Sequence, residues 1–133
     1  MLFCIALGFA SCEKDDITKP FTVETFAGIW CLPDTANNMK VTWYWELTKN
    51  GYLTYYEDYG EGHARYEKGY IVNSEDTDWR ARLQGEYSFD KATQTIYFSG
   101  IAMGTVQRTG TNEAILTSSF LKSGKCYRIK GFK

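Results

Sequence analysis

Few side chains in this chain of 133 residues could do chemistry, and none forms a catalytic or metal-binding pattern. The single histidine, His63, falls near a predicted turn, and one histidine cannot supply a metal cluster. No Cys-x-x-Cys, His-Glu-x-x-His or Gly-x-Ser-x-Gly motif occurs. Glu57, Asp58 and Glu61 could act as acid and base on a glycoside, but a solvated hairpin end explains them as well. We therefore expect no catalytic residue, metal or cofactor, and an enzyme is the least favoured class.

Cys12 is the cysteine to which the sequence assigns a chemical fate. Residues 1–10 are apolar and uncharged, and at about ten residues they are too short to span a bilayer as a helix. Such a run followed by small residues is typical of a secretory signal. Phe9-Ala10-Ser11-Cys12 resembles the bacterial lipobox, which implies that residues 1–11 are removed as a signal peptide and that Cys12 is lipidated. A buried strand or core helix is the alternative, and the charged residues at 13–16 argue against it. No Lys or Arg precedes the apolar run, so the position of the true start codon is open.

Lipid on Cys12 would hold the protein at a membrane, because two or three acyl chains anchor stably where one anchors marginally. Residues 12–25 are charged and contain one proline, which suits a flexible tether. The acidic cluster Glu13, Asp15 and Asp16 resembles the surface-export signal of lipoproteins from Bacteroides-type bacteria, and a plain solvated linker is the equal alternative. The expected location is the cell envelope, as an outer-membrane lipoprotein, with exposure at the cell surface as one option.

Beyond residue 25 the chain reads as a succession of short strands. Residues 40–48 alternate, with Trp43 and Trp45 on one face and Tyr44 on the other. Asn50-Gly51 predicts a hairpin turn. Further strands are expected at residues 52–59, 63–72, 79–89, 95–99, 105–109, 113–120 and 125–132. Short connections favour pairing between neighbours, and closing the sheet removes its exposed edges. The expected fold class is all-β, a small antiparallel up-and-down barrel of about eight strands at residues 26–133.

Composition and charge limit the partners. The formal net charge is −1, with acidic and basic residues interspersed, so nucleic-acid binding is disfavoured. Aromatic residues make up 17% of the chain, which favours strands and large contact surfaces. The length suits one domain, and no feature of the sequence indicates an oligomeric state.

Three short motifs occur in an order that resembles one family. They are Gly28-Ile29-Trp30 in the predicted first strand, Gly85-Glu86-Tyr87, and the terminal Tyr127-Arg128. Over residues 26–132 this order is similar to that of lipocalin-like domains in lipoproteins of Bacteroides-type bacteria. The resemblance implies that Gly28 and Trp30 close one end of the barrel and that Arg128 lies across the tryptophan. Other lipocalin motifs are missing, which leaves a flatter β-sandwich or a partly open barrel as alternatives.

Cys31 and Cys126 remain once Cys4 is removed with the signal and Cys12 is lipidated. They fall in the predicted first and last strands, which are neighbours in a closed barrel. An exported protein also meets an oxidising compartment. We expect a disulfide between these two strands, with two unpaired thiols as the alternative.

Aromatic residues at alternating positions indicate a binding site. Trp43, Trp45, Tyr55, Tyr66 and Tyr70 would form an apolar wall with phenolic hydrogen-bonding groups if their faces line the barrel. Alternatively, the barrel is small and these rings fill its core. The expected function is that of a lipid-anchored, lipocalin-like envelope protein that binds a small hydrophobic or amphipathic ligand. The alternative is a non-enzymatic accessory lipoprotein that contacts another protein or a glycan through its β surface.

Overall fold

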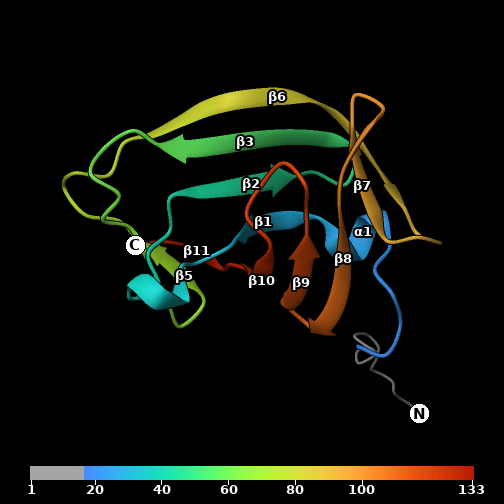
Figure 1. Cartoon of the computed structure of the whole chain (residues 1–133), viewed down its shortest axis with the longest axis horizontal. Coiled ribbons are helices and arrows are strands. Elements are labelled where there is room, and N and C mark those ends of the chain that lie inside the picture. Colours follow the sequence, from blue (N-terminus) through green and yellow to red (C-terminus); the bar gives the residue numbers. More distant parts are fainter. Residues whose placement is uncertain (1–16) are drawn as a thin grey trace, which may run out of the picture.

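Eight antiparallel strands form a closed barrel in the computed structural model, which describes residues 17–133 (Figure 1). The barrel strands are β1 (Gly28–Cys31), β2 (Trp43–Leu47), β3 (Tyr52–Asp58), β6 (Trp79–Asp90), β7 (Thr95–Phe98), β8 (Ile101–Gly110), β9 (Glu113–Thr117) and β10 (Gly124–Arg128). Their order around the barrel is β1-β10-β9-β8-β7-β6-β3-β2, and β1 pairs with β2 to close it. The expected all-β class and small eight-stranded antiparallel barrel are confirmed. The predicted signal peptide and Cys12 lie outside the described residues.

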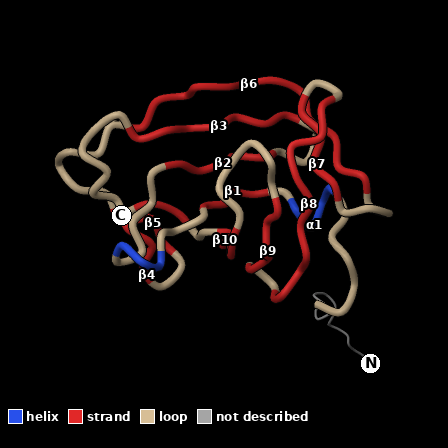
Figure 2. The backbone as a smooth tube through the Cα atoms, viewed as in Figure 1, coloured by secondary structure: helices blue, strands red, loops and turns tan. Residues whose placement is uncertain are grey.

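A second small sheet lies outside the barrel (Figure 2), so the prediction of one continuous strand at residues 63–72 is wrong. Lys68 and Gly69 have φ angles of 50° and 91°, and this turn folds the segment back on itself. The resulting strands β4 (Arg65–Glu67) and β5 (Tyr70–Val72) pair with each other, and β11 (Gly131–Phe132) adds to β5 in parallel. A second hydrophobic cluster, which includes Val41, Ile71 and Ile129, joins this sheet to the outer face of the barrel. Because that face is covered, Tyr44 is buried although it points away from the barrel interior.

Two barrel strands extend beyond their neighbours at one end. β6 pairs with β3 from Trp79 to Glu86 but with β7 only from Tyr87 to Asp90. The long pair β3 and β6 therefore overhangs the barrel, and it crosses the top of the view in Figure 1. A register shift between Tyr55 and Tyr56 marks a bulge in this pair, and bulges bend the strands that carry them. The overhang leaves the inner face of the barrel accessible at this end, which we call the open end.

The opposite end is filled by the segment that precedes β1. The short helix α1 (Val23–Phe26) is capped by Thr22, whose side chain accepts a hydrogen bond from the backbone of Thr25 in a reciprocal capping box. Phe21 and Phe26 are buried against Trp30, whose Nε1 donates to the Phe26 carbonyl at 2.8 Å. The predicted tether of residues 12–25 is therefore wrong at its C-terminal boundary, because Phe21 already belongs to the core.

Arg128 completes this closed end. Its guanidinium carbon lies 5.1 Å from the centre of the Trp30 ring. The same guanidinium donates to the carbonyls of Ala27 at 3.0 Å and Thr111 at 2.7 Å. A Cβ on Gly28 would lie 2.6 Å from the Arg128 Cδ atom, and Gly28 has a φ of 138°, so a side chain there would displace the arginine. This is the arrangement that the resemblance implied for Gly28, Trp30 and Arg128.

Cys31 and Cys126 are free thiols in the structure, so the predicted disulfide is wrong. They do lie on the neighbouring strands β1 and β10, where Cys31 pairs with Tyr127 rather than with Cys126. Adjacent residues of a strand point to opposite faces of the sheet. Cys126 packs into the barrel interior, whereas Cys31 packs into the outer cluster beneath β5. The sheet itself therefore separates the two sulfur atoms.

Candidate functional site at the open end

The structure brings together three of the five residues predicted to bind a ligand. Trp43, Trp45 and Tyr55 face the barrel interior from the paired strands β2 and β3. The ring centre of Trp43 is 5.5 Å from that of Trp45 and 5.9 Å from that of Tyr55. The alternation of β2 and the hairpin turn after it were sufficient to predict this cluster.

Tyr66 and Tyr70 do not belong to this cluster, so their assignment to the same wall is wrong. Both lie in the small outer sheet, because the turn at Lys68-Gly69 takes β4 and β5 out of the barrel. The Tyr66 ring stacks on Tyr127 at 4.5 Å, and the amino group of Lys133 lies 4.3 Å from the centre of the Tyr70 ring.

Burial of the inward-facing side chains falls from the closed end to the open end. Leu47, Leu53 and Trp30 are at most 2% exposed, so the closed half is a packed core. At the open end, Leu83 is 39% and Ile101 is 61% exposed. Leu83 is the register partner of Tyr55, and Ile101 is the partner of Phe98, whose ring would contact a Cβ at Gly85. Leu83 and Ile101 therefore lie on the inner face and present apolar surface to solvent, whereas Trp43, Tyr55 and Phe98 are covered more fully. We call Trp43, Tyr55, Leu83, Phe98 and Ile101 the open-end surface.

Polar groups lie beside the open-end surface. The Trp45 Nε1 atom is buried and has no hydrogen-bond partner among the described residues. Buried donors are rarely left unpaired, so this atom could bind a polar atom of a ligand or a water molecule. The Tyr55 hydroxyl donates to Glu57 Oε2 at 3.1 Å, and Glu57 Oε1 lies 3.5 Å from Arg82. Burial, together with the negative charge of Glu57, raises the pKa of Tyr55 to about 12, so the phenol is neutral at physiological pH.

No catalytic arrangement is seen among residues 17–133. His63 and Asp76 approach within 3.2 Å, but both side chains are about half exposed. Asp58, one of the carboxylates considered as a glycosidase acid or base, has its Oδ1 atom engaged by the backbone N–H groups of Gly60 and Asp78. It therefore ties two loops together. In the part of the chain that the structure describes, no group of three or more His, Cys, Asp or Glu side chains could hold a metal. Likewise, no helix in this part is long and apolar enough to cross a membrane.

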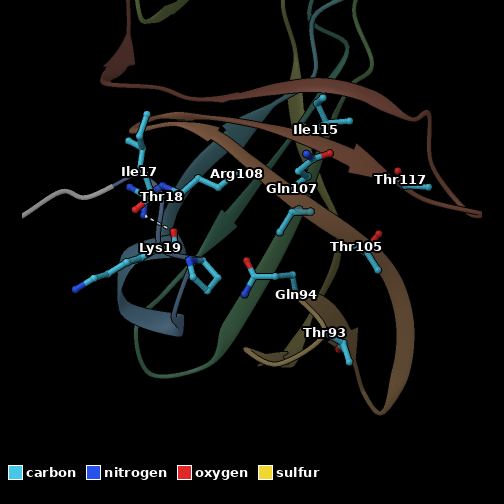
Figure 3. A pocket seen from close by; sticks show the side chains of 12 residues that line it. Ile17, Thr18, Lys19, Thr93, Gln94, Thr105, Gln107, Arg108, Ile115 and Thr117 are labelled. Carbon is cyan, nitrogen blue, oxygen red and sulfur yellow. Dashed lines mark hydrogen bonds between the residues drawn. The ribbon is translucent and has the colours of Figure 1, made fainter.

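A hollow on the outer wall of the barrel was missed by the sequence analysis. It has a volume of about 510 Å³ and lies between residues 17–20 and the outer faces of β8 and β9 (Figure 3). A second hollow of about 340 Å³ continues from it and shares Thr105 and Thr117. Thr95, Thr105 and Thr117 are register partners across β7, β8 and β9, so their hydroxyls form one row. Polar residues at alternating positions were visible in the sequence, but the approach of residues 17–20 to this wall was not.

Comparison of the chain with protein-family models, with curated proteins and with solved structures found no match. The functional assignment therefore depends on the geometry of the site.

Proposed function

We propose that this protein is a lipid-anchored, lipocalin-like, non-enzymatic protein of the cell envelope that binds a small hydrophobic or amphipathic ligand at the open end of its barrel. The open-end surface carries the proposal. A closed half that is fully packed and an open half whose inner face keeps apolar side chains exposed would together let a ligand cover that surface without unfolding the core. The unpartnered Trp45 Nε1 would give the ligand one polar contact, which suits an amphipathic molecule.

The lipid anchor is tested by the variant Cys12→Ala. Lipidation requires the thiol, and removal of the signal follows lipidation, so the variant is expected to keep residues 1–11 and to lack the mass of the acyl chains. Intact mass spectrometry of wild type and variant provides the measurement. If the two proteins carried the same lipid mass, lipidation at Cys12 would be ruled out.

Ligand binding is tested with a protein of residues 12–133 that carries Cys12→Ala, because it has neither acyl chains nor the apolar residues 1–11. Anilinonaphthalene sulfonate serves as the amphipathic probe, read by its own fluorescence and by quenching of tryptophan. Leu83→Ser is expected to weaken its binding roughly tenfold, because a leucine side chain contributes about 1.5 kcal/mol or more when covered. Ile115→Ser is the matched control, since Ile115 is also 39% exposed but lies on the outer wall.

Equal affinities for the two variants, or no saturable binding, would contradict the open-end site. Native mass spectrometry of the same protein adds a probe-independent measurement, in which a stoichiometric small molecule is expected. A co-purifying protein or glycan without a small molecule would instead favour the accessory role. The observation that favours the accessory role is an aromatic cluster on the outer face of the barrel, where Tyr44 stacks on Tyr56 and contacts Trp79 and Phe132.

A further inference from the structure

The hollow of about 510 Å³ on the outer wall is lined by cationic, hydrogen-bonding and aliphatic side chains. We call it the tether groove. Ile17, Lys19 and Pro20 form one side, and Thr105, Gln107 and Ile115 contribute to the other (Figure 3). Arg108 connects the two sides, since its Nη1 atom donates to the Lys19 carbonyl at 3.5 Å. Its guanidinium carbon also lies 4.6 Å from the centre of the buried Phe21 ring, so the side chain is held in place.

The described residues that line the tether groove carry positive charge only. Lys19 and Arg108 are cationic, and none of these twelve described residues is acidic, although the chain as a whole has a net charge of −1. Figure 3 shows the Lys19 side chain extending outward from the rim. Threonine hydroxyls and the Gln107 amide add neutral hydrogen-bonding groups between these cations. Arg108 is held by the carbonyls of Gly110 and Lys19, so Lys19 is the cation that this surface presents to an anionic group.

The same surface exposes aliphatic side chains. Ile17 is 45% and Ile115 is 39% exposed, and both line the tether groove. Exposed aliphatic residues beside lysine and arginine are typical of protein surfaces that lie at a lipid interface, because the alkyl groups enter the headgroup region while the cations meet its negative charge. A groove for a soluble anion alone would not need them.

Chain connectivity brings this face close to a membrane. Ile17 follows Cys12 by five residues, which reach at most about 17–18 Å when fully extended. We infer that the tether groove and the outer face of β8 and β9 beside it rest on the anionic surface of the membrane in which Cys12 is anchored. This inference uses the lipid anchor of the proposed function for its geometry. The open-end surface lies on the inner face of the barrel, so a groove contact on the outer wall leaves it accessible from water.

The contact is tested with a protein of residues 12–133 that carries Cys12→Ala, so that affinity comes neither from acyl chains nor from the apolar residues 1–11. Sedimentation with vesicles of phosphatidylethanolamine and phosphatidylglycerol, compared with vesicles of phosphatidylcholine alone, measures the partition coefficient. Binding to the anionic vesicles is expected to be stronger and to fall with salt. Lys19→Gln is expected to lower it about fivefold, the effect of one lysine near a charged bilayer. Lys49→Gln removes the same charge at the exposed turn between β2 and β3 and should have little effect.

Further variants separate the lipid surface from other occupants. Ile115→Ser should weaken vesicle binding and Leu83→Ser should not, which reverses the pattern expected for the open-end probe. Replacing Glu13, Asp15 and Asp16 by their amides should strengthen binding, because their carboxylates repel the same surface. Equal partition of the Lys19→Gln and parent proteins would overturn the inference. So would competition by inorganic phosphate at millimolar concentration or by a soluble anionic polysaccharide, since either would show that the groove takes a soluble anion or a glycan. Lipidation and probe binding are measured separately, so each proposal can fail by itself.

Discussion

Arg128→Ala is expected to lower the free energy of unfolding by about 3 kcal/mol, because one side chain joins three parts of the closed end. The guanidinium lies on the Trp30 ring, and it donates to the carbonyls of Thr25 and Ala27 at the C-terminal end of α1. It also donates to Thr111 and Asn112 in the turn between β8 and β9. Hydrogen bonds from a charged donor contribute about 1.5–3 kcal/mol each when their acceptors would otherwise be unpaired, and partial exposure reduces that value here. Urea denaturation followed by tryptophan fluorescence measures the change.

Two further variants distinguish the shape of this side chain from its charge. Arg128→Lys keeps the positive charge but loses the planar set of donors, so we expect it to recover less than half of the lost stability. Arg65→Ala removes an exposed arginine from β4 and is expected to change stability by less than about 0.5 kcal/mol. If Arg128→Ala were as mild as Arg65→Ala, the closed end would not depend on the arginine.

The free energy of unfolding is expected to fall steeply above pH 9, because two buried thiols stay protonated in the folded protein but ionise in the unfolded chain. Burial raises the pKa of Cys126 from its ordinary value of about 9 to about 12, and burial together with the proximity of Cys126 raises that of Cys31 further. The folded protein therefore keeps two protons that the unfolded chain releases above pH 9. Stability is complete below that pH and declines as pH rises toward the folded values. The slope is about 2.7 kcal/mol per pH unit for two thiols, which is large against a typical total of about 5–15 kcal/mol.

The measurement is urea denaturation at several pH values between 8 and 10.5, with the double variant Cys31→Ala and Cys126→Ala as the control. The variant should be less stable at pH 8, because it leaves small cavities, but its stability should change far less with pH below the range where tyrosines titrate. Alkylation of the wild type in denaturant without reductant should modify both cysteines. A flat profile to pH 10, or two unreactive cysteines, would show a disulfide and contradict the arrangement in which the sheet separates the two thiols.

Local sequence patterns were sufficient to predict most of the barrel strands and three of the five proposed ligand-binding residues. The alternation of residues 40–48 placed Trp43 and Trp45 on one face, and Asn50-Gly51 paired that strand with the one that carries Tyr55. Strand period and turn residues are short-range properties, so they can be read without knowing the rest of the fold. The motif order also implied that Arg128 would meet Trp30, although the two residues are far apart in the chain.

Other features depended on long-range contacts, that is, on which face of each strand packs against another part of the chain. That β1 and β10 are adjacent follows from closing a meander, but whether Cys31 and Cys126 share a face depends on a register that closure alone does not fix. The turn at Lys68-Gly69 carried Tyr66 and Tyr70 outside the barrel, and Phe21 joined the core because the closed end needed apolar side chains to fill it. The sequence by itself determined the eight-stranded barrel and the aromatic face of its second strand. Only the tertiary structure decided which aromatic rings remain accessible and that residues 17–20 form a groove with β8 and β9, because long-range register and packing arise from the whole chain at once.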